Sequence, residues 1–137
     1  MLTVMLQNLI KMDRLSKSDP CVTCSLVDKE TGTLKQVGQT ETIWNDHNPV
    51  FETKFQIETY RKQEVVFHVY DMDNDGKVKT DNLIGSLRCQ ARDLLYHGKK
   101  WRLTNSANKD RDTKLFETDS RISFVVDAHT HMHTLTH

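Results

Sequence analysis

Aspartate residues gather in two short polar segments of this 137-residue chain. The first segment carries a pair and the second carries four, and the six residues are Asp13, Asp19, Asp71, Asp73, Asp75 and Asp81. One aspartate alone would be interpreted as a solvated turn former. Six of them repel one another, because two carboxylates about 5 Å apart cost roughly 3 kcal/mol at an effective dielectric of 20. Calcium takes roughly six to eight oxygen ligands from flexible segments of this kind, so the pattern predicts a Ca²⁺ site.

Both aspartate segments follow stretches that are typical of β-strands. Residues 2–9 place Leu2, Val4 and Leu6 on one face by alternation, and residues 64–70 do the same with a run of valines around Phe67. If these two strands run side by side, the segments that follow them meet at one end of the fold. The alternation therefore predicts a framework that positions the carboxylates.

Strand patterns continue along the rest of the chain. The predicted strands span residues 2–9, 21–27, 34–44, 51–57, 64–70, 83–89, 100–103 and 121–126. The only helical candidate covers residues 91–97, and residues 105–119 form a long polar connection. Short strands at this spacing predict an all-β fold, an eight-stranded antiparallel β-sandwich or barrel, over residues 1–127. Residues 128–137 are a histidine-rich, low-complexity tail that we expect to be disordered.

Composition excludes several classes of protein. Nineteen basic residues balance nineteen acidic ones, which argues against nucleic acid as a partner. Three cysteines are an odd number and favour reduced thiols in the cytoplasm over a disulfide framework. Cys21 and Cys24 are three residues apart in a strand and point to opposite faces, so we expect buried free thiols rather than a metal pair. No apolar stretch is long enough to span a membrane, so any membrane contact is predicted to be peripheral.

Three motifs in order resemble the C2 domain family. Leu9-Ile-Lys-Met-Asp13 with Ser18-Asp19-Pro20 is similar to its first calcium-binding loop, and Asn48-Pro49-Val50-Phe51 resembles its mid-domain motif. Tyr70-Asp-Met-Asp-Asn-Asp-Gly76, followed by Leu83-Ile-Gly85, resembles its third loop. The match covers residues 2–127 and looks most like the C2 domains of copines.

The resemblance implies a set of calcium ligands. By position in the family motifs these are Asp13 and Asp19, then Asp71 and Asp73, with Asp75 as an additional candidate. The last ligand is either Asn82, which lies three residues before Gly85, or Asp81, one position earlier. The resemblance further implies a C2 sandwich of type II topology, because no extra strand fits before the first motif.

The implied function is calcium-dependent docking on anionic phospholipid membranes. Leu15 in the first loop and Val78 in the third are apolar residues in polar segments, and Lys77 and Lys79 flank Val78. We expect these four residues to contact the membrane, although Leu15 has an equally good interpretation as a packing residue beneath its loop. The protein would be cytoplasmic and recruited peripherally when calcium rises. The alternative function is a C2 domain that binds other proteins without calcium.

Two competing interpretations fit the residues less well. The residues from Asp71 to Gly76 also match the beginning of an EF-hand loop, but its twelfth position is Asn82 rather than glutamate, and the flanks are strands. No Ser/His/Asp order, phosphate-binding glycine loop or pair of catalytic acids is present, so we predict that the protein is not an enzyme.

Overall fold

The computed structural model describes residues 2–7, 19–44, 46, 48–58, 62–72, 82–95, 100–105 and 116–126. These residues form eight strands and one short 3-10 helix. The strands are β1 (Leu2–Gln7), β2 (Pro20–Val27), β3 (Leu34–Gln39), β4 (Val50–Phe55), β5 (Glu64–Asp71), β6 (Leu83–Gln90), β7 (Trp101–Asn105) and β8 (Phe116–Val126). The helix η2 (Ala91–Leu95) follows β6 and lies within residues 91–97, which were predicted to be helical. The predicted tail, residues 128–137, lies outside the described residues.

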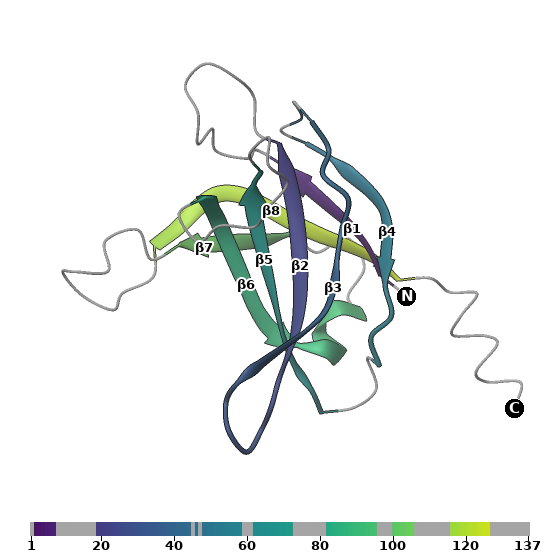
Figure 1. The fold of residues 1–137 in the computed structure, drawn as a ribbon, viewed down its shortest axis with the longest axis vertical. Helices are drawn as coiled ribbons and strands as arrows, with labels where there is room; N and C mark the ends of the chain where they lie inside the picture. Colours follow the sequence, from purple (N-terminus) through teal and green to yellow (C-terminus); the bar gives the residue numbers. More distant parts are fainter. Residues whose placement is uncertain are drawn as a thin grey trace, which may run out of the picture.

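The strands form two layers. Neighbouring strands are antiparallel in the order β3-β2-β5-β6-β7-β8-β1-β4. Strands β6 and β7 pair at Ser86 and Thr104, and there the sheet folds over on itself. Figure 1 shows β3, β2, β5 and β6 as one layer, with β7, β8 and β1 crossing behind it and β4 at the right, beyond β3. The predicted antiparallel β-sandwich is thereby confirmed.

Alternation on β5 builds the core between the layers. Val65, Phe67 and Val69 have no exposed surface, as their spacing in the sequence predicts. The ring centroid of Phe67 lies 6.0 Å from that of Phe55 on β4 and 4.7 Å from that of Phe124 on β8. Fully burying such a side chain stabilises the fold by roughly 1.5–3 kcal/mol, so these rings hold the two layers together.

The order of the strands matches the type II arrangement. β8 pairs with β1 along its length, with Leu2 opposite Val126 and Gln7 opposite Arg121. β1 leads into the first aspartate segment. The strand that pairs with β1 along its whole length is β8, which follows β7 in the chain and does not precede β1. The permuted connection predicted from the family resemblance is therefore present.

Two strand boundaries differ from the prediction by more than two residues. β8 begins at Phe116, so the assignment of residues 116–119 to a polar connection was wrong. Their pairing with β7, which sets Asn105 opposite Phe116 and Thr104 opposite Glu117, extends the strand although most of these residues are polar. β3 ends at Gln39 rather than at Trp44. The pairing of β3 with β2 ends there. At the next residue, Thr40, the buried side-chain oxygen accepts a hydrogen bond from the Val22 amide at 2.9 Å.

The three cysteines are buried free thiols, as predicted. Cys24 lies in the core, whereas Cys21 lies on the other face of β2 and donates to the Thr40 carbonyl at 3.3 Å. Burial, together with the nearby Cys89 thiol, raises the pKa of Cys24 to about 12. A thiol with so high a pKa stays protonated and unreactive, which fits a packing role.

Candidate functional site

The ladder between β2 and β5 brings the two predicted aspartate segments together. Pro20, at the beginning of β2, lies opposite Asp71, at the end of β5. The Asp19 amide donates to Oδ1 of Asp71 at 2.9 Å, and the Met72 amide donates to the Asp19 carbonyl at 2.9 Å. The two segments therefore meet where β2, the strand after the first segment, begins and where β5, the strand before the second segment, ends. The condition that the two strands before the segments run side by side is not met, because β2 and not β1 is the neighbour of β5.

The third described residue of the predicted site also lies at this end. Tyr70 pairs with Leu83, so the antiparallel register brings Asn82 close to Asp71. Asp71 is 7% exposed, while Asp19 and Asn82 are half-buried. We call the end of the sandwich that carries Asp19, Asp71 and Asn82 the loop end. Asp13, Asp73, Asp75 and Asp81 lie outside the described residues, and so do the predicted membrane contacts Leu15, Lys77, Val78 and Lys79.

The donor chemistry of the loop end suits a hard cation. Two carboxylates and one amide oxygen are ligand types that calcium prefers over imidazole or thiolate. Among the described residues, no group of three or more histidine, cysteine, aspartate and glutamate side chains is placed to hold a metal. Asp19 and Asp71 therefore carry the type of oxygen ligand that calcium prefers. The remaining predicted ligands belong to the two aspartate segments.

A third segment, residues 40–43, reaches the loop end and was not among the predicted site residues. Residues 40–43 continue beyond β3 along the beginning of β2. The Thr40 amide donates to the Val22 carbonyl at 2.8 Å, and the Ile43 amide donates to the Pro20 carbonyl at 3.1 Å. The next residue, Trp44, is 53% exposed. The signal that could have identified it is the alternation of an inward Ile43 with an outward tryptophan just before the Asn-Pro motif.

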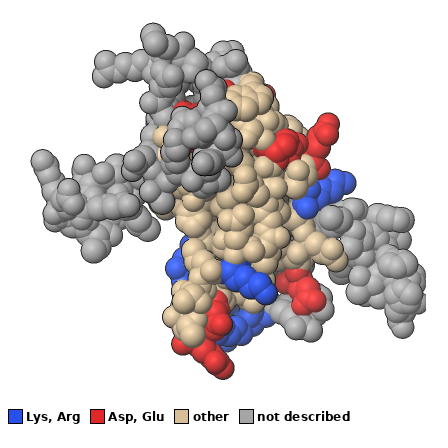
Figure 2. Space-filling view, in the orientation of Figure 1, with Lys and Arg blue, Asp and Glu red and all other residues tan. Residues whose placement is uncertain are grey.

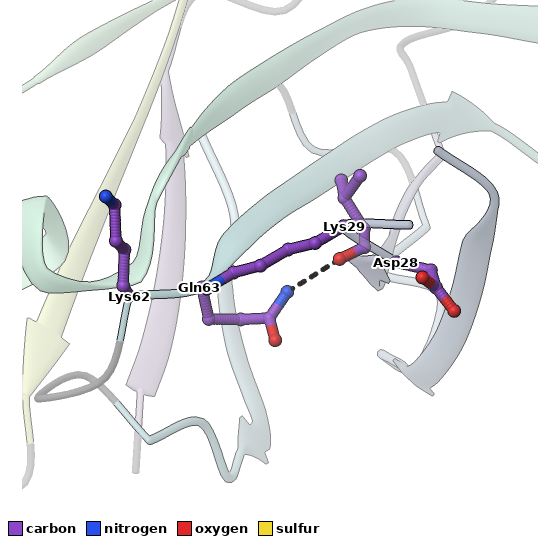
Figure 3. Close-up of a pocket in the computed structure, with 5 residues that line it drawn as sticks. Asp28, Lys29, Lys62 and Gln63 are labelled. Atoms are coloured by element: carbon purple, nitrogen blue, oxygen red, sulfur yellow. Dashed lines mark hydrogen bonds between the residues drawn. The ribbon is translucent and has the colours of Figure 1, made fainter. Parts of the chain in front are cut away.

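The opposite end of the sandwich carries a different set of groups, which we call the hairpin end. It comprises the turn at residues 28–33 and residues 62–64. A hollow of 560 Å³ lies there, and it is lined by Val27, Asp28, Lys29, Lys62 and Gln63 (Figure 3). The Gln63 side chain crosses it and donates to the Val27 carbonyl at 3.0 Å. Beside it, Arg88 donates to Glu64 at 2.9 Å on the surface.

The outer face of the β3–β2–β5–β6 layer is mostly uncharged. Figure 2 shows a broad area without charged side chains across its middle, and several of the visible lysines and arginines lie towards the hairpin end. No helix within the described part of the chain is long and apolar enough to cross a membrane.

Known proteins resemble this chain over most of its length. The family model of the C2 domain matches residues 3–106. Copine-A of Dictyostelium discoideum is 33% identical over 98 residues, which are 69% of this chain and 15% of the relative. The chain thus spans about 15% of the length of that curated relative.

Two solved structures share the fold. BON1-C2B superposes with a TM-score of 0.73 at 24% identity, over 90% of this chain and 85% of that chain. A C2 domain of plant Extended Synaptotagmin 1 superposes with a TM-score of 0.51 at 19% identity, over 92% of this chain and 95% of that chain. C2 domains are typically non-catalytic modules that bind membranes or proteins. The family match over most of the chain, on a sandwich with this strand order, shows that the protein belongs to the C2 domain family and resembles the copine type.

Proposed function

We propose that this protein is a calcium-dependent membrane-binding module that docks through its loop end. The observation that carries the proposal is the contact between Asp19 and Asp71, one residue from each aspartate segment. A carboxylate that is only 7% exposed and hydrogen-bonded to a neighbouring backbone is a rigid acceptor, already held in position before any cation arrives. Bound calcium would add positive charge there and link these carboxylates to the phosphates of anionic lipids.

The ligands in this proposal are those of the sequence prediction. Asp13, Asp19, Asp71 and Asp73 form the main set, with Asp75 as an addition and Asp81 or Asn82 as the last ligand. Replacing Asp81 with asparagine weakens calcium binding if Asp81 is the ligand, and Asn82→Ala then has little effect. The order reverses if Asn82 holds the position. Isothermal calorimetry of the two variants separates the cases, and two negligible effects would remove both residues from the set.

The deciding experiment is vesicle co-sedimentation with calcium and with a chelator. Vesicles of phosphatidylcholine and phosphatidylserine should pellet the protein in calcium and release it in chelator. Asp71→Asn should abolish the calcium-dependent fraction, and Asp28→Asn, the same change at the hairpin end, should not. Binding that is equal in calcium and chelator, or absent in both, contradicts the proposal and favours a C2 domain that binds proteins.

Thermal melting gives an independent test in solution. A ligand at 100 times its dissociation constant adds about 2.7 kcal/mol to the free energy of unfolding if it binds only the folded state. Millimolar calcium should therefore raise the melting temperature, and Asp73→Asn should remove most of the gain. An unchanged melting curve in the parent protein argues against calcium binding altogether.

A further inference from the structure

The loop end presents a large aromatic side chain to solvent. Trp44 is 53% exposed, whereas the preceding residue, Ile43, packs against the core. Val50 is 58% exposed and begins β4, where it pairs with Met5 near the end of β1. Exposed tryptophan is unusual, because the indole ring is among the largest apolar surfaces a side chain can bury. An exposed aromatic side chain at the loop end indicates a binding surface for an external partner.

The segment that leads into Trp44 is tied to the sheet by hydrogen bonds. At its base the Glu41 carboxylate accepts hydrogen bonds from the Glu52 amide at 2.7 Å and the Thr53 amide at 3.2 Å. Further along, the Asp46 carboxylate accepts one from the Asn48 amide at 2.8 Å, which forms a local turn before the buried Pro49. The backbone that leads into Trp44 is thus tied to β4 through Glu41 and to the beginning of β2 through Ile43, which lowers the conformational entropy lost when the indole is covered.

Trp44 lies close to the proposed calcium site. Its neighbour Ile43 is hydrogen-bonded to Pro20, and Pro20 follows Asp19 directly in the chain. Since adjacent Cα atoms are about 3.8 Å apart and paired strands about 5 Å apart, the Cα atoms of Trp44 and Asp19 are within about 13 Å. Trp44 therefore lies at the same end of the sandwich as the contact between Asp19 and Asp71.

We propose that Trp44 enters the interface of a phospholipid membrane beside the Asp19–Asp71 site, as a third membrane-contacting segment of the domain. The inference rests on the proposed function and extends it to a segment that its residue set does not contain. A lipid interface suits the side chain, because tryptophan places its ring among acyl chains while the indole N–H remains among headgroups and water. The position next to acidic residues favours this partner, because calcium-bridged anionic headgroups would lie against the same surface.

The protein contains its own spectroscopic probe for this proposal. Its two tryptophans are Trp44 and Trp101, and Trp101 is half-buried on β7. The Trp101→Phe variant leaves Trp44 as the single emitter. With calcium and phosphatidylserine-containing vesicles, its emission should shift to shorter wavelength, and lipids brominated on the acyl chains should quench it. Trp44→Phe leaves Trp101, whose emission should change little. If Trp101→Phe unfolds, the difference between the parent protein and Trp44→Phe provides the same spectrum.

A binding measurement gives the second readout. Trp44→Ala should weaken calcium-dependent vesicle binding by roughly tenfold or more, since about half of an indole no longer leaves water, while calcium affinity without vesicles and the melting temperature stay unchanged. Leu34→Ala is the matched control, because Leu34 is 46% exposed at the beginning of β3, opposite the last residue of β2. Calcium-dependent sedimentation with no spectral shift and no effect of Trp44→Ala overturns this inference and leaves the proposed function intact. No sedimentation of the parent protein overturns the proposed function itself.

Discussion

The two ends of the β2–β5 ladder are stabilised by different kinds of polar contact. At the loop end the buried Asp71 carboxylate accepts a hydrogen bond from the Asp19 backbone amide. The buried Thr40 hydroxyl accepts one from the Val22 amide. At the hairpin end the charged contact between Arg88 and Glu64 lies on the surface. Buried polar groups cost free energy when they lose a partner, whereas exposed pairs contribute little. The loop end is therefore expected to tolerate far less change, which is what a binding site needs to hold its geometry.

The glycines of the two ends provide the test with the largest expected effect. A Cβ on Gly85, near the beginning of β6, would lie 2.9 Å from the Leu103 Cβ and 3.2 Å from the Thr104 carbonyl oxygen. Because both atoms belong to or adjoin the backbone of β7, Gly85→Ala should destabilise the fold by about 2–3 kcal/mol. At the hairpin end Gly32 has open space around it and a φ of 75°, so Gly32→Ala should cost only about 1 kcal/mol. Urea denaturation of both variants compares the costs, and equal losses would break the contrast between the ends.

Aspartate substitutions give the next effect. Asp71→Ala removes the acceptor of the Asp19 amide and should cost about 1–3 kcal/mol without calcium. Asp71→Asn keeps an oxygen acceptor, so it should lose less stability but still lose the gain from calcium. Asp28→Ala removes the acceptor of the exposed Glu30 and Thr31 amides and should cost less than about 1 kcal/mol. Thermal melts of the three variants, each with and without calcium, should follow this order.

Acid should weaken the loop end through Glu41. Burial raises the pKa of Glu41, but hydrogen bonds from Thr53 and from backbone amides outweigh burial and hold the pKa below its usual value. A lowered pKa means that the stabilisation is complete above the unfolded-state value of 4.5 and is lost as pH falls through the folded-state value. Glu41→Gln should therefore cost about 0.5–1 kcal/mol at pH 7 and nothing further on acidification through this range. Melting of parent and variant from pH 7 to pH 3 measures the difference, and parallel curves would exclude this contribution.

The exposed ion pair of the hairpin end should have the smallest effect. Glu64 and Arg88 are held at 2.9 Å, but their side chains are 34% and 56% exposed. A double-mutant cycle on Glu64→Gln and Arg88→Gln should give a coupling of about 0.2–0.5 kcal/mol, which salt reduces. A coupling above about 1 kcal/mol would show that the hairpin end also depends on specific polar contacts.

Sequence periodicity predicted the framework well where side chains alternate between core and solvent. Val65, Phe67 and Val69 share one face, so their strand and its core role could be predicted directly, whereas the burial of Val66 on the other face could not. The beginning of β8 could not, since residues 117–119 carry no strand signal and are ordered by pairing with β7. For the site, the motifs identified Asp19, Asp71 and Asn82, which the structure brings together. Alternation could have placed Trp44 on the outer face, but its position at the loop end depends on the hydrogen bond from Ile43 to Pro20, a contact between segments distant in the sequence.

The position of β1 has a consequence for how the protein is made. β1 lies between β4 and β8, so one of its edges is completed only by the last strand of the fold. A ribosome adds roughly 5–20 residues per second, which places the synthesis of β8 about 6–25 s after that of β1. Throughout that interval β1 has an open edge that another chain could pair with. We therefore expect chains that lack β8 to associate through this edge of β1, which the finished domain covers.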